Sequence, residues 1–164
     1  MPCSQARGSQ HDHGMQIDQL MTRALVTCHP GDRLDRAVQL MWDHDIGCVL
    51  VTGLDGRLVG IVTDRDACIA AWTQGLALDR IAVQDAMARS VWSCGPSQDV
   101  HALEQVMRVH QIRRVPVVDA LGIPIGIVSL NDLARAARSS PDAAINQREV
   151  ERTLAAISMP RHSA

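Results

Sequence analysis

The sequence predicts a mixed α/β fold (α+β) in which two pseudo-symmetric β-α-β-β-α repeats pack as one module. The stretch GIVTDRD at residues 60–66 returns as GIVSLND at 126–132, and this offset aligns 17–71 with 83–137 without a gap. Of the 55 aligned pairs, 17 are identical, which indicates an internal duplication. Units this short share a core with their twin more readily than they fold alone.

Each repeat is expected to begin with a strand, a turn and a helix. Apolar residues at 25–27 and at 91–93 predict the strand, and Pro30 or Pro96 then predicts the turn. Apolar residues next recur at helical spacing, which predicts an amphipathic helix. The residues expected to precede the two helices are Asp32 and Ser97.

Each repeat is expected to continue with a hairpin and a second helix. The predicted strand pairs are 48–51 with 58–62 and 115–118 with 123–128, joined at 54–56 and 120–122. The GIVTDRD and GIVSLND stretches then begin helices that run towards Ala71 and Ala137.

The chain outside the repeats is short. The predicted ranges are a flexible N-terminal leader (1–16), a first repeat (17–71), a connection (72–82), a second repeat (83–137) and a partly helical C-terminal tail (138–164). In the tail, Ser140 is expected as a helix N-cap and Pro141 as the first helical residue.

Composition excludes several classes of function. The chain has 16 Lys and Arg against 18 Asp and Glu, so its net charge of −2 gives no general attraction for nucleic acid or anionic lipid. With no Phe or Tyr and only three Trp residues, a base-stacking platform is not expected. No apolar run approaches the roughly 18 residues of a membrane span. We therefore expect neither nucleic acid nor a membrane as partner.

Cysteine usage predicts a cytoplasmic location. The five Cys residues are an odd number without a C-x-x-C motif, and the N-terminal residues lack the apolar stretch of a signal peptide. Such a pattern is typical of a reducing compartment. Cys28 and Cys94 occupy equivalent positions and could form a metal or redox pair, although two small buried thiols explain them more simply.

Two hydroxyl–carboxylate pairs are the main candidate site residues. Thr63 with Asp66, and Ser129 with Asp132, fit the capping-box spacing at a helix start. The same groups could bind ribose and phosphate, because a helix N-terminus favours anions. Helix capping alone would explain one such pair well, whereas its presence in both repeats favours a ligand-binding role.

A pair of arginines occurs only in the second repeat. Arg113 and Arg114 precede V-P-V, and guanidinium groups offer planar donor pairs to phosphate oxygens. A solvated surface pair is the alternative. The first repeat has Gly47 and Cys48 at these positions, so its own cleft is expected to take a less charged ligand or none.

Taken together, these motifs resemble a tandem cystathionine β-synthase (CBS) domain pair, or Bateman module. The resemblance rests on G-hydrophobic-hydrophobic-[ST]-x-x-D in both repeats and on IRRVPVVD at 112–119, and it covers residues 17–137. With no enzyme, channel or transporter attached, the chain is most similar to the stand-alone CBS-pair proteins of bacteria. The family likeness implies clefts between the repeats that receive AMP, ADP, ATP or S-adenosylmethionine.

The resemblance also implies a role for each candidate residue. The ribose hydroxyls would bind Asp66 and Asp132, with Thr63 and Ser129 near ribose and phosphate. The adenine pocket would be lined by residues around Thr27 and Ser93 and by the backbone of Pro116 and Val117. The phosphate would contact Arg113 and Arg114.

The expected function is regulatory. The sequence lacks G-x-S-x-G, H-E-x-x-H and Walker motifs, so no enzyme activity and no required cofactor are predicted beyond an adenosyl ligand. A thiol- or metal-responsive sensor and a structural interaction protein with vestigial clefts are the alternatives. Family modules commonly pair into a disc, so a homodimer with an unknown protein target is expected.

Overall fold

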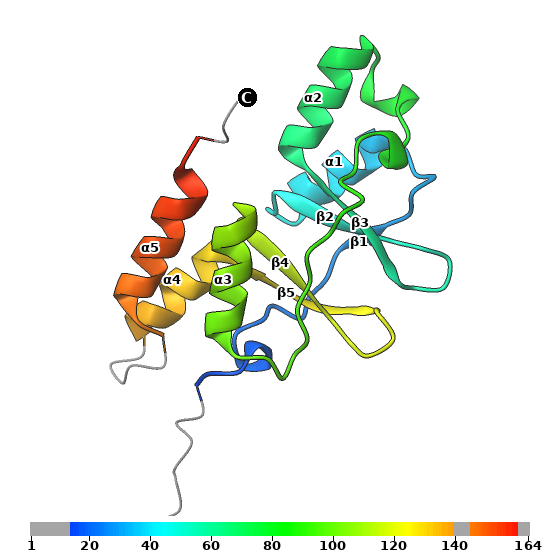
Figure 1. Ribbon diagram of the computed structural model, residues 1–164. Coiled ribbons are helices and arrows are strands. Elements are labelled where there is room, and N and C mark those ends of the chain that lie inside the picture. The colour runs from blue at the N-terminus through cyan, green and yellow to red at the C-terminus, as the bar shows by residue number, and fades with distance from the viewer. Residues whose placement is uncertain (1–13, 140–144, 161–164) are drawn as a thin grey trace, which may run out of the picture.

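The computed structural model describes residues 14–139 and 145–160 and has the predicted mixed α/β architecture. Figure 1 shows the two repeats side by side, each a small sheet with its helices. The first repeat consists of η1 (Ile17–Gln19), β1 (Thr27–Cys28), α1 (Leu34–Asp43), β2 (Cys48–Thr52), β3 (Leu58–Thr63) and α2 (Asp64–Gln74). The connection contains η2 (Leu78–Arg80), and the second repeat consists of η3 (Val83–Asp85), α3 (Val100–His110), β4 (Arg114–Val118), β5 (Pro124–Ser129) and α4 (Leu130–Ser139).

The two sheets differ by one strand. In the first repeat β1 pairs parallel with β2, and β2 pairs antiparallel with β3. In the second, β4 and β5 form an antiparallel pair, and the strand expected at 91–93 is reduced to a single parallel bridge between Cys94 and Val117. Leu50 N donates to Val26 O, whereas its equivalent Pro116 has no N–H to donate. The expectation of a first strand in the second repeat is therefore wrong.

The core of each repeat includes residues that lie at or just before the N-terminal end of the other repeat. Ile17 and Met21 are buried in the core of the second repeat, among residues such as Leu103 and Val117. Ile81 and Val83 are buried in the core of the first. The ranges assigned to the leader, repeats and connection stay predictions of where the duplication begins and ends. In space, the two halves are interlocked through these segments.

Reciprocal backbone contacts define a pseudo-two-fold relation between the repeats. Thr22 bridges Ile127, and the residues 66 positions away, Ala88 and Ile61, bridge in the same way. The other related pairs are Gln16–Asp99 with Arg33–Ala82, and Leu34–Ile81 with Val100–Met15. These contacts explain why the two copies keep a gap-free register, since an insertion in one would disturb its contacts with the other.

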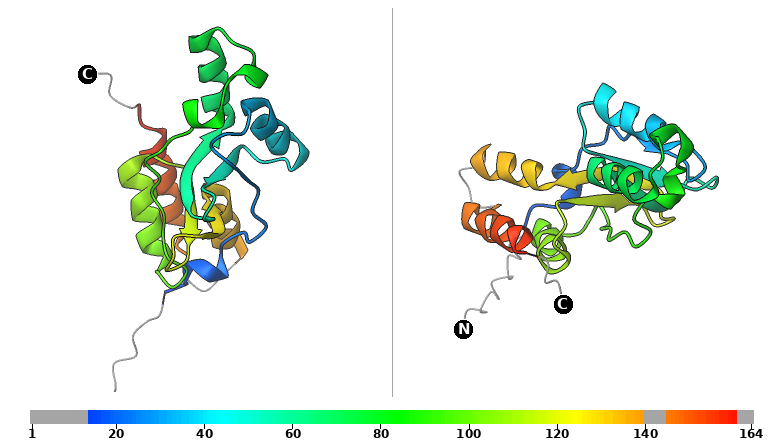
Figure 2. Two further views of the ribbon diagram at one scale, coloured as in Figure 1. Left: turned by 90° about the vertical axis from the view of Figure 1, so that its right-hand side faces the viewer. Right: turned by 90° about the horizontal axis from the view of Figure 1, so that it is seen from above.

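A final helix, α5 (Gln147–Ser158), packs on the second repeat. It lies against α3 and α4, as both views of Figure 2 show, and buries Val150, Thr153 and Ile157. Its N-cap is Asn146, whose side chain accepts from Arg148 N. The predicted cap at Ser140 and first helical residue at Pro141 lie outside the described residues. Within the described ranges, no helix has the length and apolar character needed to cross a bilayer.

Candidate functional site

Both hydroxyl–carboxylate pairs form the predicted capping boxes. Thr63 Oγ1 accepts from Asp66 N at 3.2 Å, and Asp66 Oδ2 accepts from Thr63 N at 2.9 Å. Ser129 Oγ accepts from Asp132 N at 3.3 Å, and Asp132 Oδ2 accepts from Ser129 N at 2.7 Å. The capping interpretation is thus confirmed for both pairs, and a ligand role must come from whatever else each pair faces.

Ser129 and Asp132 line a cleft of about 260 Å³ between the repeats. The first repeat contributes the stretch before β1 and the loop before β2, and the second contributes β4, β5 and the start of α4. The lining residues used below are Thr22, Leu25, Val26, Ile46, Gly47, Leu50, Arg114, Ile127, Asn131 and Arg135. The lining combines apolar side chains with charged ones, Asp45 of the first repeat among them, and this mixture suits a ligand with an aromatic base and a polar tail.

The carboxylate of Asp132 has two distinct environments. Oδ2 is held by the cap, accepting also from Ser129 Oγ at 2.6 Å, while Oδ1 pairs with the guanidinium of Arg135. Asp132 is buried, but the Arg135 side chain is 71% exposed. Because the Arg135 side chain lies mostly in water, its hold on Asp132 is loose and water can replace it. A hydroxyl donor can therefore replace Arg135 on Oδ1 without disturbing the cap.

Arg114 reaches the cleft through space that Gly47 leaves open. A Cβ built on Gly47 would lie 2.8 Å from Arg114 Nη2 and 3.5 Å from Asp64 Oδ2. Among the described residues, neither Arg114 nor Arg113 forms an ion pair. Within the described part of the chain, the Arg114 guanidinium thus lies at the cleft wall without an ion-pair partner, and the Asp64 carboxylate lies nearby.

A second cavity of about 250 Å³ continues from the cleft past Arg114. Ser129, Asn131 and Arg114 line both spaces, whereas Arg113 lines only the second. Leu154 of α5 closes part of this cavity. Arg114 therefore contacts both the cleft and the adjoining cavity beside the C-terminal helix, whereas Arg113 contacts only that cavity.

The other predicted site residues do not line either cavity. Thr63 and Asp66 cap α2, and Pro116 and Val117 are buried in β4, where Pro116 O accepts from Cys94 N at 3.0 Å. The pseudo-two-fold relation makes Thr63, Asp66 and Pro116 the equivalents of Ser129, Asp132 and Leu50. They mark the place of a symmetry-related cleft, and their ligand roles stay predictions.

The predicted adenine-pocket residues Thr27 and Ser93 also lie outside these cavities. Thr27 belongs to β1, and the cleft is lined by the residues just before it, from Thr22 to Val26. The adenine-pocket roles of Thr27 and Ser93 stay predictions.

Several cleft residues were not predicted as site residues, and Arg135, Asn131 and Gly47 show why. Arg135 follows Asp132 by one helical turn, a spacing that places both side chains on one face, so it had a usable signal. Asn131 follows the motif serine by two residues and had no clear signal. Gly47 was noted only because it replaces an arginine of the second repeat. Its role in leaving space for Arg114 was not visible, because Arg114 comes from the other repeat.

The two equivalent cysteines are buried separately. Cys28 belongs to the core of the first repeat and Cys94 to that of the second. Burial and the nearby Asp32 carboxylate raise the pKa of the Cys28 thiol to about 11, and burial also raises the pKa of Cys94. Both thiols are protonated at neutral pH, which agrees with packing residues.

The fold agrees with comparisons to known proteins. A model of the CBS domain matches residues 17–72 and 83–139, so the chain belongs to the CBS-domain family, with two copies. The CBS domain-containing protein YhcV of Bacillus subtilis is 34% identical over 118 residues, which cover 72% of this chain and 82% of YhcV. Its relatives thus include stand-alone CBS-pair proteins.

Solved structures give the same result. A conserved protein from Pyrococcus horikoshii is similar with a TM-score of 0.71 and 27% identity, over 80% of this chain and 98% of the other. CBSX2, solved in complex with AMP, is similar with a TM-score of 0.68 and 27% identity, over 77% of this chain and 98% of the other.

Proposed function

We propose that the chain is a regulatory sensor module that binds an adenosyl ligand in the cleft between its repeats and signals to a protein target by a change of conformation. AMP, ADP, ATP and S-adenosylmethionine are the candidate ligands. The observation that carries this proposal is one cleft in which an apolar wall, the Asp132 carboxylate and the guanidinium of Arg114 meet.

Each part of the ligand has a matching part of the cleft. Leu25, Val26 and Ile46 offer apolar surface to the base. Asp132 Oδ1 can accept from ribose hydroxyls, as the acidic residue of dinucleotide-binding folds does. Arg114 can donate to a phosphate, and charge-assisted hydrogen bonds of this type are the stronger ones.

The CBSX2 complex with AMP supports the choice of an adenine nucleotide, since that protein has the same fold. A role in signalling is supported by the position of the cleft, whose walls come from both repeats. A ligand that contacts both walls favours one arrangement of the repeats over another. The proposal includes no catalytic step and no required cofactor, and it includes a cytoplasmic location.

The direct test is binding by the full chain. AMP, ADP, ATP, S-adenosylmethionine and adenosine are titrated by calorimetry, and the melting temperature is recorded with each. A ligand at 100 times its Kd stabilises the fold by about 2.7 kcal/mol. The proposal fails if no compound binds at millimolar concentration, or if the bound nucleotide is turned over.

A pair of equivalent variants separates binding from capping. Asp132→Ala and Asp66→Ala each remove one capping carboxylate, but only Asp132 lines the cleft. We expect Asp132→Ala to weaken AMP and adenosine alike in this cleft, while Asp66→Ala leaves its affinity near that of the unmodified chain. Equal losses in the two variants would contradict the site.

We also propose that the chain forms a homodimer through α1 and α2. The helices of the second repeat are covered by α5, whereas Trp42 on α1 and Trp72 on α2 are 86% and 82% exposed. Trp42 is the equivalent of Arg108, which contacts α5. Exposed tryptophans at this place suit an interface with a second copy.

Analytical ultracentrifugation should give a dimer that Trp42→Arg and Trp72→Arg convert to the 17.8 kDa monomer. A monomeric parent chain would contradict this proposal.

A further inference from the structure

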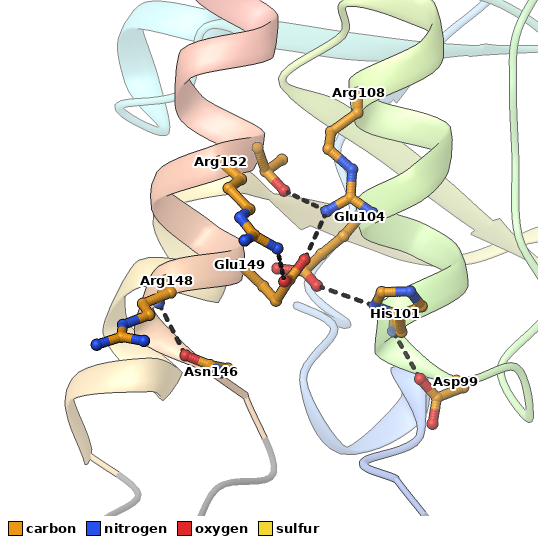
Figure 3. Close-up of polar contacts among 9 residues, drawn as sticks. Asp99, His101, Glu104, Arg108, Asn146, Arg148, Glu149 and Arg152 are labelled. Carbon is orange, nitrogen blue, oxygen red and sulfur yellow. Dashed lines mark hydrogen bonds and ion pairs between the residues drawn. The ribbon is translucent and has the colours of Figure 1, made fainter.

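Three side chains with metal-ligating atoms meet where α3 packs on α5. His101 and Glu104 come from α3 and Glu149 comes from α5, and one ligand atom from each lies within 4.8 Å of the other two. Figure 3 shows the imidazole and both carboxylates converging between the two helices. None of these residues lines the cleft or the cavity beside it.

Glu104 is an unusual residue for this position. It is only 3% exposed, and its Oε1 has no hydrogen-bond partner in the structure. Its other oxygen, Oε2, lies 3.8 Å from His101 Nδ1, which is longer than a hydrogen bond. The equivalent residue of the first repeat is Val38. A carboxylate in place of an apolar residue is costly to bury unless a cation or a set of donors compensates for it.

The surrounding charges leave room for such a cation. Glu149 Oε2 accepts from Arg108 at 3.1 Å, and Oε1 accepts from Arg152 at 2.8 Å. The Arg152 side chain is 73% exposed, so its ion pair is weak and it can leave Glu149. Arg108 donates to Glu149 and to Thr153, and it leaves the buried Oε1 of Glu104 without a hydrogen-bond donor.

We propose that His101, Glu104 and Glu149 bind one divalent first-row transition cation, with Zn²⁺ as the best fit. Imidazole nitrogen and carboxylate oxygen are ordinary zinc ligands, and three protein ligands with a water in the fourth position make a familiar tetrahedral set. Glu104 Oε2 lies 3.8 Å from His101 Nδ1, and Oε1 of the same buried carboxylate has no hydrogen-bond partner among the described residues, so this carboxylate is available to a cation.

Such an ion links the C-terminal helix to the second repeat. Two ligands belong to α3 and one to α5, so binding fixes α5 in its docked position. Leu154 of α5 lines the cavity beside Arg113 and Arg114. Metal binding therefore stabilises the wall of that cavity, independently of whether an adenosyl ligand is present.

The test is Zn²⁺ binding by the full chain after removal of metal with a chelator. Competition with a chromophoric chelator gives the Kd and stoichiometry, and the melting temperature is measured with and without Zn²⁺. His101→Ala and Glu104→Val each remove one ligand, and Val is the residue that the first repeat has at this position. Glu151→Gln is the control, because Glu151 is exposed on α5 and lies outside the cluster.

We expect both ligand variants to lose one equivalent of Zn²⁺ or to weaken its Kd by at least about tenfold, as metal sites do even when only supporting groups are changed. The control should bind as the parent does. Glu104→Val should fold at least as well as the metal-free parent, because it removes a buried charge, so its loss of Zn²⁺ cannot be attributed to unfolding. Unchanged Zn²⁺ stoichiometry and Kd in both ligand variants, or no binding by the parent, would overturn the proposal. Zn²⁺ bound only through cysteines or other histidines would appear as this unchanged result.

Discussion

The two repeats have the same order of helices, yet they contribute different things to the cleft. The first repeat supplies space through Gly47, and the second supplies charge through Arg114, which extends into that space. A side chain at position 47 would compete for this space, because a Cβ built on Gly47 would lie only 2.8 Å from Arg114 Nη2. The duplication therefore produced complementary halves, and the charged cleft needs one of each.

The helices of the two repeats differ in the same way. α3 carries Glu104 and Arg108 and is covered by α5, whereas α1 has Val38 and Trp42 at the equivalent positions. The helix that α5 covers therefore has charged residues at these positions, and the helix that α5 does not cover has an exposed tryptophan. The helices of the second repeat are thus covered by α5 of the same chain, whereas Trp42 on α1 of the first repeat is exposed.

The largest expected effect concerns the exchange of core segments between the repeats. Ile17 is fully buried in the core of the second repeat, so Ile17→Ala should lower the free energy of unfolding by about 2–5 kcal/mol. Ile69→Ala is the control, because Ile69 lies on α2 and is 46% exposed. Urea titration monitored by circular dichroism measures both. A change below about 0.5 kcal/mol for Ile17→Ala would mean that the segment before the first strand does not stabilise the second repeat.

The equivalent cysteines test whether either repeat has a reactive thiol. A pKa of about 11 for Cys28 makes its thiolate about a hundredfold scarcer at pH 8 than that of a thiol at the usual 9.0. Because the pKa is raised, the reactive form increases only as pH rises towards 11. Alkylation with iodoacetamide, mapped by mass spectrometry, should label exposed Cys68 well before Cys28 and Cys94. Labelling of Cys28 as fast as Cys68 at neutral pH would favour the thiol-sensor alternative.

The division between space and charge predicts a selective loss of phosphate binding. Arg114→Ala should weaken AMP by about 1.5–3 kcal/mol, or about ten- to hundredfold, while adenosine loses little. Arg113→Ala should have a smaller effect on AMP, because Arg113 lines only the neighbouring cavity. The double variant gives the combined loss, and Arg138→Ala, at the exposed end of α4, is the control. If calorimetry finds that AMP and adenosine lose equal affinity, the arginines do not bind phosphate and the solvated surface pair is the better interpretation.

Local features of the fold could be predicted because neighbouring residues determine them. The capping boxes at Thr63 and Ser129 follow from a spacing of three residues, and the hairpin turns have glycines at positive φ, Gly56 and Gly122. The reduced first strand of the second repeat was also within reach, since Pro116 cannot donate a hydrogen bond.

Long-range features could not be predicted in the same way. Nothing near Ile17 in the sequence indicates that it packs in the second repeat, and Gly47 shows no sign of the arginine that fills its space. The cover that α5 gives to Glu104 is also invisible to a pattern within α3. Each of these contacts joins residues far apart in the chain, so only the folded topology reveals it.

The smallest expected effect decides what the duplicated motif does. Ser129→Ala and Thr63→Ala each remove an N-cap acceptor, so without ligand both should lower stability by about 1 kcal/mol. Only Ser129 lines the cleft, so a saturating ligand should raise the melting temperature of Thr63→Ala as much as that of the parent, and that of Ser129→Ala by less. Thermal melts of the three proteins, with and without AMP, make this comparison. If AMP stabilises both variants to the same extent, the hydroxyl of Ser129 is a cap and nothing more. A difference between them assigns the cap to both repeats and the ligand contact in this cleft to the second.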